Sequence, residues 1–276
     1  MQFKICTYLF FIFFSINNCF GQTDLDTSKN ELNKGKRNDI QQDYNQQHQT
    51  YNSSKNFGDG LKDNIVGDLM IYIGAAIVGN YATEDQLYNP LSKYPYLDPL
   101  NGNYTKPGSA NVYKHIRFDI EDQFLFSNKD LYGNHLKAKL RPFHYFYFQS
   151  EMFQLFEYNR PADKHSNLLL YNLDFCYDRL RFERFNIGLT AGANYVANDV
   201  KKGGFAFGFN TDIFIAKPIS IYSSVKWSGI NGQSVNTLEI QGRYHQKNFF
   251  VSLGYQHLKI AVPKYNFVSL GIGIYL

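Results

Sequence analysis

From about residue 114 to the end of the chain, apolar and polar residues alternate in ten segments separated by turn residues. Successive side chains of a strand point to opposite faces, so each segment is predicted to be a β-strand with one apolar and one polar face. In one segment, Phe185 and Ile187 fall on one face, and Asn186 and Thr190 fall on the other. The predicted strands are 114–127, 134–142, 144–158, 167–180, 184–197, 204–216, 218–229, 235–246, 248–260 and 265–276.

The predicted connections differ in length from one to the next. Every second connection is tight, as at Arg141-Pro142-Phe143 and Lys217-Pro218, and the others are longer and polar, as at 159–166 (NRPADKHS). Short periplasmic turns and longer outer loops are typical of membrane β-barrels. An even number of strands would also place both ends of the barrel on the periplasmic side.

The last predicted strand, YNFVSLGIGIYL, ends in alternating apolar residues. It resembles the closing strand of bacterial outer-membrane β-barrels, which the insertion machinery of that membrane reads, although those barrels usually end in Phe. The resemblance covers about residues 113–276. It implies an all-β fold, a ten-stranded antiparallel transmembrane β-barrel, and a place in the bacterial outer membrane. The residues predicted to face lipid and to guide insertion are Val268, Leu270, Ile272, Ile274 and Leu276.

The N-terminal third of the chain lacks the regular alternation of apolar and polar residues seen in the later segments. Residues 1–21 read as a secretory signal peptide, and residues 22–62 are so polar that we expect a disordered periplasmic arm. Residues 63–112 are expected to hold a short helix or plug and an irregular linker before the barrel at 113–276. The ambiguous stretch is 64–82, which fits a short helix at the periplasmic mouth or an extra hairpin, and the hairpin would give twelve strands.

Composition narrows the class further. Aromatic residues make up 17% of the chain, whereas its mean hydropathy is only −0.38. Export, many aromatics and a polar average favour a membrane barrel, in which only every second residue must be apolar. A soluble sandwich alternates too, with its apolar face inward. The net charge of +4 is mild and gives no reason to expect nucleic-acid binding. Cys176 is the one cysteine beyond the signal peptide, so no internal disulfide is expected.

The polar faces of the predicted strands carry charges of both signs. Ten strands enclose a bore only slightly wider than eight, which side chains can fill. Long charged residues in such a space should pair across it, so we expect a packed, salt-bridged lumen. The residues of this predicted lumen network are Arg117, Asp119, Glu121, Lys137, Lys139, Arg141, Glu151, Asp174, Asp178, Asp212, Lys226, Glu239 and Arg243.

Three functional hypotheses remain open at this stage. The first is a non-enzymatic barrel with a structural, anchoring or partner-binding role. The second is a narrow channel for ions or small solutes, gated or plugged by residues 64–82. The third is a surface hydrolase of the omptin or lipase kind, for which His165 and His257 are the histidines to consider, although no Ser/His/Asp spacing supports it.

The sequence indicates no catalytic residue, metal site or cofactor, because it has no zinc spacing, no EF-hand loop and no phosphate-binding glycine loop. The expected partners are outer-membrane lipid and lipopolysaccharide, the barrel-insertion machinery and an envelope or periplasmic protein.

Overall fold

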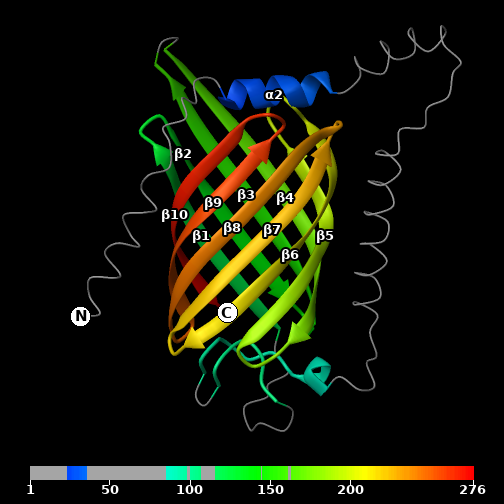
Figure 1. Cartoon of the computed structure of the whole chain (residues 1–276), viewed down its shortest axis with the longest axis vertical. Coiled ribbons are helices and arrows are strands. Elements are labelled where there is room, and N and C mark those ends of the chain that lie inside the picture. The colour runs from blue at the N-terminus through cyan, green and yellow to red at the C-terminus, as the bar shows by residue number, and fades with distance from the viewer. Residues whose placement is uncertain (1–23, 36–84, 98–99, 107–115, 144, 161–162) are drawn as a thin grey trace, which may run out of the picture.

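The computed structural model describes residues 24–35, 85–97, 100–106, 116–143, 145–160 and 163–276. Ten antiparallel strands form a closed barrel, which confirms the predicted fold class (Figure 1). The elements are α2 (Asp24–Lys34), η4 (Asp85–Tyr88), β1 (Arg117–Asn128), β2 (Leu131–Arg141), β3 (Phe146–Asn159), β4 (Lys164–Arg181), β5 (Phe185–Val196), β6 (Lys202–Ala216), β7 (Ile219–Ile230), β8 (Gln233–Gln246), β9 (Phe249–Ile260) and β10 (Lys264–Tyr275).

Each strand pairs with the next one along the chain, and β1 pairs with β10 to close the barrel. The closing register runs from Asp119 opposite Tyr275 to Phe126 opposite Val268. Beyond β10, the backbones of Phe118 and Leu276 exchange hydrogen bonds of 3.0 and 2.8 Å. We call the end where β1 begins and β10 finishes the terminal mouth. The opposite end, where β1 turns into β2, is the hairpin mouth.

The wall of the barrel has an apolar outside and a largely polar inside. The exposed fraction is 64% at Leu270 and 63% at both Leu173 and Phe205, which lie on the outer face. The five residues predicted to face lipid all lie on this face, with exposed fractions from 37% at Ile274 to 64% at Leu270. A soluble protein buries its apolar face, so this inverted arrangement is that of a barrel surrounded by lipid.

The predicted contrast between tight turns and long outer loops is wrong. At the hairpin mouth, only Lys129 and Asp130 separate β1 from β2, and only Asn231 and Gly232 separate β7 from β8. The residues assigned to longer loops mostly extend the strands, because a backbone ladder continues wherever its hydrogen bonds are made, whether or not the side chains are polar. Strand β4, for example, begins at Lys164 and not at Asn167.

The N-terminal arm is not wholly disordered, which corrects the expectation for residues 22–62. Residues 24–34 form helix α2, with two aspartates in its first turn and Lys34 in its last, as the helix dipole favours. Gly35 follows with a φ of 61° and donates its N–H to the carbonyl of Glu31, a common way for a helix to end. Among the described residues, no helix has the length and apolar character needed to span a membrane. The predicted signal peptide and the ambiguous stretch 64–82 lie outside the described residues.

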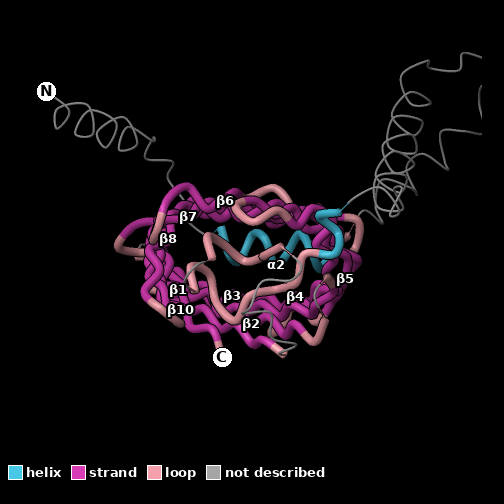
Figure 2. Tube along the Cα trace, turned by 90° about the horizontal axis from the view of Figure 1, so that it is seen from below, coloured by secondary structure: helices cyan, strands magenta, loops and turns pink. Residues whose placement is uncertain are grey.

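The interior is filled in layers along the barrel axis. Helix α2 lies across the hairpin mouth, as the side view and the axial view both show (Figures 1 and 2). Residues 89–97 and 100–105, here called the mouth segment, cover the terminal mouth and are joined by an antiparallel bridge between Leu91 and Tyr104. The charged residues of the strands occupy the bore between these two covers.

Candidate functional site

The lumen is the candidate site, because it gathers the charged side chains of the whole barrel. All thirteen residues of the predicted lumen network lie on the inner face, and none is more than 9% exposed. Their positions follow from the two-residue period of a strand, since Lys137, Lys139 and Arg141 occupy alternate positions of β2. The partners of each charge depend on which walls of the barrel meet across the bore.

The middle of the lumen is crossed by ion pairs between strands that are not neighbours in the sheet. The Lys226 ammonium on β7 donates to Glu151 on β3 and to Asp174 on β4, at 2.5 Å each. The Lys137 ammonium on β2 donates to Glu239 on β8 at 2.6 Å. Buried pairs of this kind are weak evidence for stability, but breaking one leaves an uncompensated charge at a cost of about 3–5 kcal/mol. The pairs therefore fix opposite walls against each other.

Guanidinium groups dominate the layer nearer the terminal mouth. Arg243 donates to Glu121 at 2.8 Å and to Asp212 at 3.4 Å. Arg141 donates to Asp178 at 2.8 Å and to Asp119 at 3.4 Å. Asp119 is also held by Arg117, two residues before it on β1, which donates to its two carboxylate oxygens at 2.8 and 2.9 Å.

The mouth segment joins this layer through buried polar contacts. The Tyr104 hydroxyl donates to Asp178, and the Asn103 amide donates to Asp212 at 3.3 Å. Arg117 in turn donates to the carbonyl of Ser92 at 3.2 Å. Burial, followed by the charge of Asp178, raises the pKa of the Tyr104 phenol well above its usual value, so this hydroxyl stays a donor. Burial also raises the pKa of Tyr96 to about 12.

The hairpin mouth is closed by apolar contact. Leu25 and Leu32 of α2 are fully buried against inward-facing apolar residues at the ends of the strands, an apolar layer that strand parity did not predict. The wall residues of this cluster are Leu125, Leu131, Phe153, Leu155, Leu168, Leu170, Val196, Val200, Ile230, Val235, Leu258, Ile260, Tyr265 and Phe267.

Polar contacts fix the orientation of α2 in this mouth. The Leu25 N–H donates to Glu157 at 2.9 Å, and the Ser28 and Tyr265 hydroxyls are 2.7 Å apart. Lys164 donates to Asp26 at 2.7 Å. Partial burial acts to raise the pKa of Asp26, but hydrogen bonds from Lys164 and Ser166 and the nearby ammonium charges outweigh it and hold that pKa below its usual range. Burial raises the pKa of Asp24.

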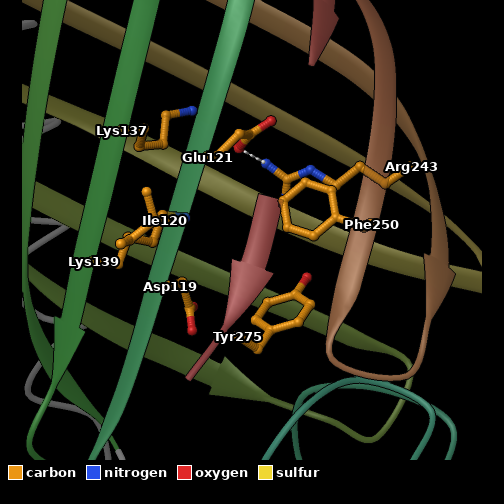
Figure 3. A pocket seen from close by; sticks show the side chains of 8 residues that line it. All are labelled: Asp119, Ile120, Glu121, Lys137, Lys139, Arg243, Phe250 and Tyr275. Carbon is orange, nitrogen blue, oxygen red and sulfur yellow. Dashed lines mark hydrogen bonds and ion pairs between the residues drawn. The ribbon is translucent and has the colours of Figure 1, made fainter. Parts of the chain in front are cut away.

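One charged residue of the network stands apart from the ion pairs. The Lys139 side chain is 6% exposed, and its ammonium makes no hydrogen bond or ion pair with any residue that the structure describes. Its Nζ lies 4.7 Å from the ring centre of Tyr222 and 5.8 Å from that of Tyr147. It borders a small cavity between β1, β2, β8, β9 and β10 (Figure 3).

Two buried histidines were missed by the sequence reasoning. His135 stacks on Phe153 with ring centres 3.7 Å apart and contacts the Gln256 amide at 2.9 Å. His245 Nε2 lies 2.7 Å from the Ser220 hydroxyl. Parity could have found both, because each is two positions from a predicted lumen charge. The Ser220–His245 pair has the spacing of a nucleophile and base, but Ser220 is 1% exposed and the other ring nitrogen faces a tyrosine hydroxyl at 3.4 Å, not a carboxylate.

The two histidines considered for hydrolysis lie apart from one another at the hairpin end. His165 stacks on Tyr158 with ring centres 4.6 Å apart, and His257 Nδ1 lies 2.7 Å from the Asn266 amide oxygen. Cys176 is fully buried with a free thiol. Within the described parts of the chain, no group of three or more His, Cys, Asp or Glu side chains is placed to hold a metal ion.

The closed antiparallel barrel, its apolar outer face and its charged lumen define the class: this is a bacterial outer-membrane β-barrel protein, and its place is the outer membrane. Neither the scan of protein-family models nor the search of curated proteins found a match.

Comparison with solved structures finds small outer-membrane barrels. The KdgM porin in complex with disordered oligogalacturonate is 12% identical, with 58% of this chain and 97% of that one covered and a TM-score of 0.34. Yersinia pestis Ail in a nanodisc is 13% identical, with coverage of 59% and 100% and a TM-score of 0.34. An outer-membrane channel from Pseudomonas putida F1 is 8% identical, with coverage of 62% and 100% and a TM-score of 0.35.

Proposed function

We propose that this protein is a sealed, non-enzymatic outer-membrane barrel with an anchoring or partner-binding role, and that solutes do not pass through it. The observation that carries the proposal is the set of ion pairs crossing the bore, above all Lys226 bridging Glu151 and Asp174 at 2.5 Å. A solute moving along the axis would have to separate these buried charges. Helix α2 and the mouth segment cover the two ends, so three obstacles stand in series.

In this role the outer face would contact lipid and lipopolysaccharide, after insertion by the barrel-insertion machinery. An envelope or periplasmic protein would bind at one of the mouths, where the described chain is not embedded in lipid. The projecting strand ends at the hairpin mouth offer one such surface, including Arg160, which donates to Asp130 at 2.7 Å.

Conductance of the full-length protein in planar bilayers tests the proposal. We expect no steady conductance above that of protein-free membranes, and an unrelated open porin added to the same bilayers gives the positive control. Stable unitary currents from the wild-type protein would contradict the proposal.

A narrow gated channel is the second candidate, and the position of α2 favours it. The helix is not part of the sheet, and it closes the hairpin mouth through side-chain burial, so its displacement would uncover that mouth. The variant L25D/L32D should unseat α2 by burying two carboxylates against an apolar layer. The sealed barrel predicts that this variant still does not conduct, because the ion pairs and the mouth segment remain in place.

Currents that appear in L25D/L32D would instead identify a channel gated by α2. The matched control is N30D, which adds a carboxylate to the exposed side of the same helix. Neither candidate predicts conductance from this control.

A further inference from the structure

We infer that this protein forms a dimer with two-fold symmetry in the membrane through the outer face of β1, β2 and β3, and that Asp122 of each copy accepts a hydrogen bond from Ser150 of the other. Dimerisation of this kind is independent of conduction, because it uses only the outside of the barrel.

A carboxylate lies on the lipid-facing side of the wall. Asp122 is exposed, whereas every other acidic residue of the described strands is buried. It is the sixth of the twelve residues of β1, and the residues opposite it on the neighbouring strands are Leu136 and Ile272. Ionisable side chains at membrane depth are costly and mark functional contacts. Asp122 therefore calls for a partner outside its own barrel.

Three neutral polar residues share this face, and their hydrogen bonds are incomplete. The Asn134 amide has two N–H groups and donates one of them to Asp122 at 2.7 Å. Among the described residues, neither the Ser150 hydroxyl nor the Gln154 amide has a hydrogen-bond partner. Hydrocarbon offers polar groups no partner either. The β1–β3 face, as we call these four residues, thus carries an acceptor together with free donors, which is what a self-complementary surface requires.

Aromatic side chains on both sides place the β1–β3 face at the depth of the hydrocarbon. Toward the hairpin mouth, Tyr132 stacks on Phe124 and on Phe156, with ring centres 6.4 and 5.6 Å apart. Toward the terminal mouth, the rings of Phe148 and Phe175 are 5.6 Å apart. Girdles of aromatic residues flank the apolar band of a membrane barrel at its two interfaces. Polar side chains between the girdles face lipid unless another protein covers them.

The register brings Asp122 and Ser150 to a similar depth. Ile120, Ala138 and Ser150 are paired in one row across β1, β2 and β3. Followed further, this row leads from the fourth residue of β1 to Phe205, the fourth residue of β6, so it climbs from near the terminal mouth to near the hairpin mouth. For strands tilted by about 40°, Ser150 then lies about 6 Å above Ile120, and Asp122, two residues along β1, lies about 5 Å above it.

A two-fold axis that passes through β2 parallel to the barrel axis satisfies both copies at once. Strand β1 of each copy then faces β3 of the other, so the contact between Asp122 and Ser150 is made twice. The two carboxylates stay about 10 Å apart, because each lies one strand spacing from the axis. A different partner would have to supply a donor for Asp122 and an acceptor for Ser150, whereas a second copy has both at the matching depth.

Sedimentation equilibrium of the purified full-length protein in density-matched detergent micelles measures dimerisation. We expect a wild-type dimer and, in D122S, a dissociation constant raised at least about 30-fold, since two hydrogen bonds across the interface are lost. S150D should be weaker still, because carboxylates then face each other. D122S/S150D exchanges the two groups and should recover the dimer. The matched control is S223D, which adds a carboxylate to an outward serine of β7 and should dimerise as wild type does.

Thiol crosslinking in phosphatidylcholine vesicles tests the position of the axis and decides the matter even if D122S does not fold. A short bismaleimide should join copies of A138C, at the axis, and should leave A193C, on the outward face of β5, at background. The native Cys176 is buried and does not compete. A monomeric wild type, equal crosslinking at the two positions, a D122S dimer as stable as wild type, or failure of D122S/S150D to recover would overturn the inference.

Discussion

The two mouths of the barrel are closed by segments that both precede the first strand, yet the contacts that close them differ in kind. At the hairpin mouth, α2 buries Leu25 and Leu32 in an apolar layer. At the terminal mouth, the mouth segment binds through Tyr104 and Asn103 to carboxylates that also hold arginines of the wall. Burial of its leucines stabilises the docking of α2 itself, so the helix can undock while the hydrogen bonds and ion pairs of the barrel wall stay intact. A cover tied into a buried charge network shares its partners with the wall, so the two should be lost together.

The largest effect should come from D178A at the terminal mouth. Asp178 is fully buried and accepts from Arg141 and Tyr104, so its removal leaves the buried Arg141 guanidinium with only its 3.4 Å contact to Asp119, which Arg117 already holds. We expect the free energy of unfolding to fall by about 3–5 kcal/mol. Urea unfolding in lipid vesicles, followed by the fluorescence of the single tryptophan, Trp227 on β7, measures it.

The matched control for D178A is D130A, which removes a carboxylate from an exposed ion pair with Arg160. This control should change stability by no more than about 1 kcal/mol. If D178A were as mild as D130A, the terminal cover would be independent of the wall, and the contrast between the mouths would fail.

A purely local effect, with a smaller change in the global free energy of unfolding than in D178A, is expected from L25A/L32A at the hairpin mouth. Each Leu→Ala change at a buried site costs about 2–5 kcal/mol. Since α2 lies outside the sheet, the combined loss of about 4 kcal/mol or more should appear as local opening, with α2 amides exchanging about 1,000-fold faster or approaching the rate of an undocked helix. Hydrogen exchange of residues 24–34 measures the opening, and urea unfolding monitored at Trp227 should keep its midpoint.

The control N30A changes the exposed side of α2 and should leave exchange within about twofold of wild type. A large drop in the urea midpoint of L25A/L32A would show that α2 supports the wall, so that the apolar cover is coupled to the wall as the polar cover is.

The smallest effect concerns pH at the hairpin mouth. The pKa of Asp26 is held below its usual range in the docked helix, so its contribution is complete above the ordinary aspartate pKa and is lost as pH falls through the lowered value. Because Lys164 is largely exposed, solvent screens the Asp26–Lys164 pair and its contribution to docking is small. In wild type, acidification therefore removes the contribution of Asp26 while the raised pKa of Asp24 favours docking, so the docking of α2 should gain less on acidification than it does in D26N.

In D26N, Asp24 is the remaining aspartate of the first turn of α2. Because its pKa is raised in the docked helix, it takes up a proton more readily there than in the undocked helix, so docking should strengthen as pH falls. Hydrogen exchange of α2 at several pH values, corrected for the intrinsic exchange rate, compares the variant with wild type. Identical pH profiles would remove the assigned role of the Asp26–Lys164 pair.

The barrel wall could be predicted from the sequence because the strand period is strict. Once Leu276 is placed outward, parity assigns Leu270 to lipid and Lys137 and Glu239 to the lumen. Parity cannot say that Lys137 meets Glu239, because that contact depends on which strands face each other across a closed ring.

Helix α2 could not be predicted for a different reason. Its sequence, DLDTSKNELNK, is short and has only two leucines, so burial against the barrel supplies most of its stability. The apolar layer beneath it was missed too, since inward residues such as Leu155 and Leu168 depart from the rule of a polar lumen.

The placement of the two covers has a consequence for how the protein reaches its membrane. Helix α2 precedes every strand in the chain, but it lies at the mouth opposite the one where β1 begins, and the mouth segment lies at the same mouth as β1. Gly35 and Asp85 thus lie at opposite ends of the barrel. A barrel made of strands alone can be inserted with all the preceding chain left on one side of the membrane. For this protein, the export route must deliver α2 and the mouth segment to different sides.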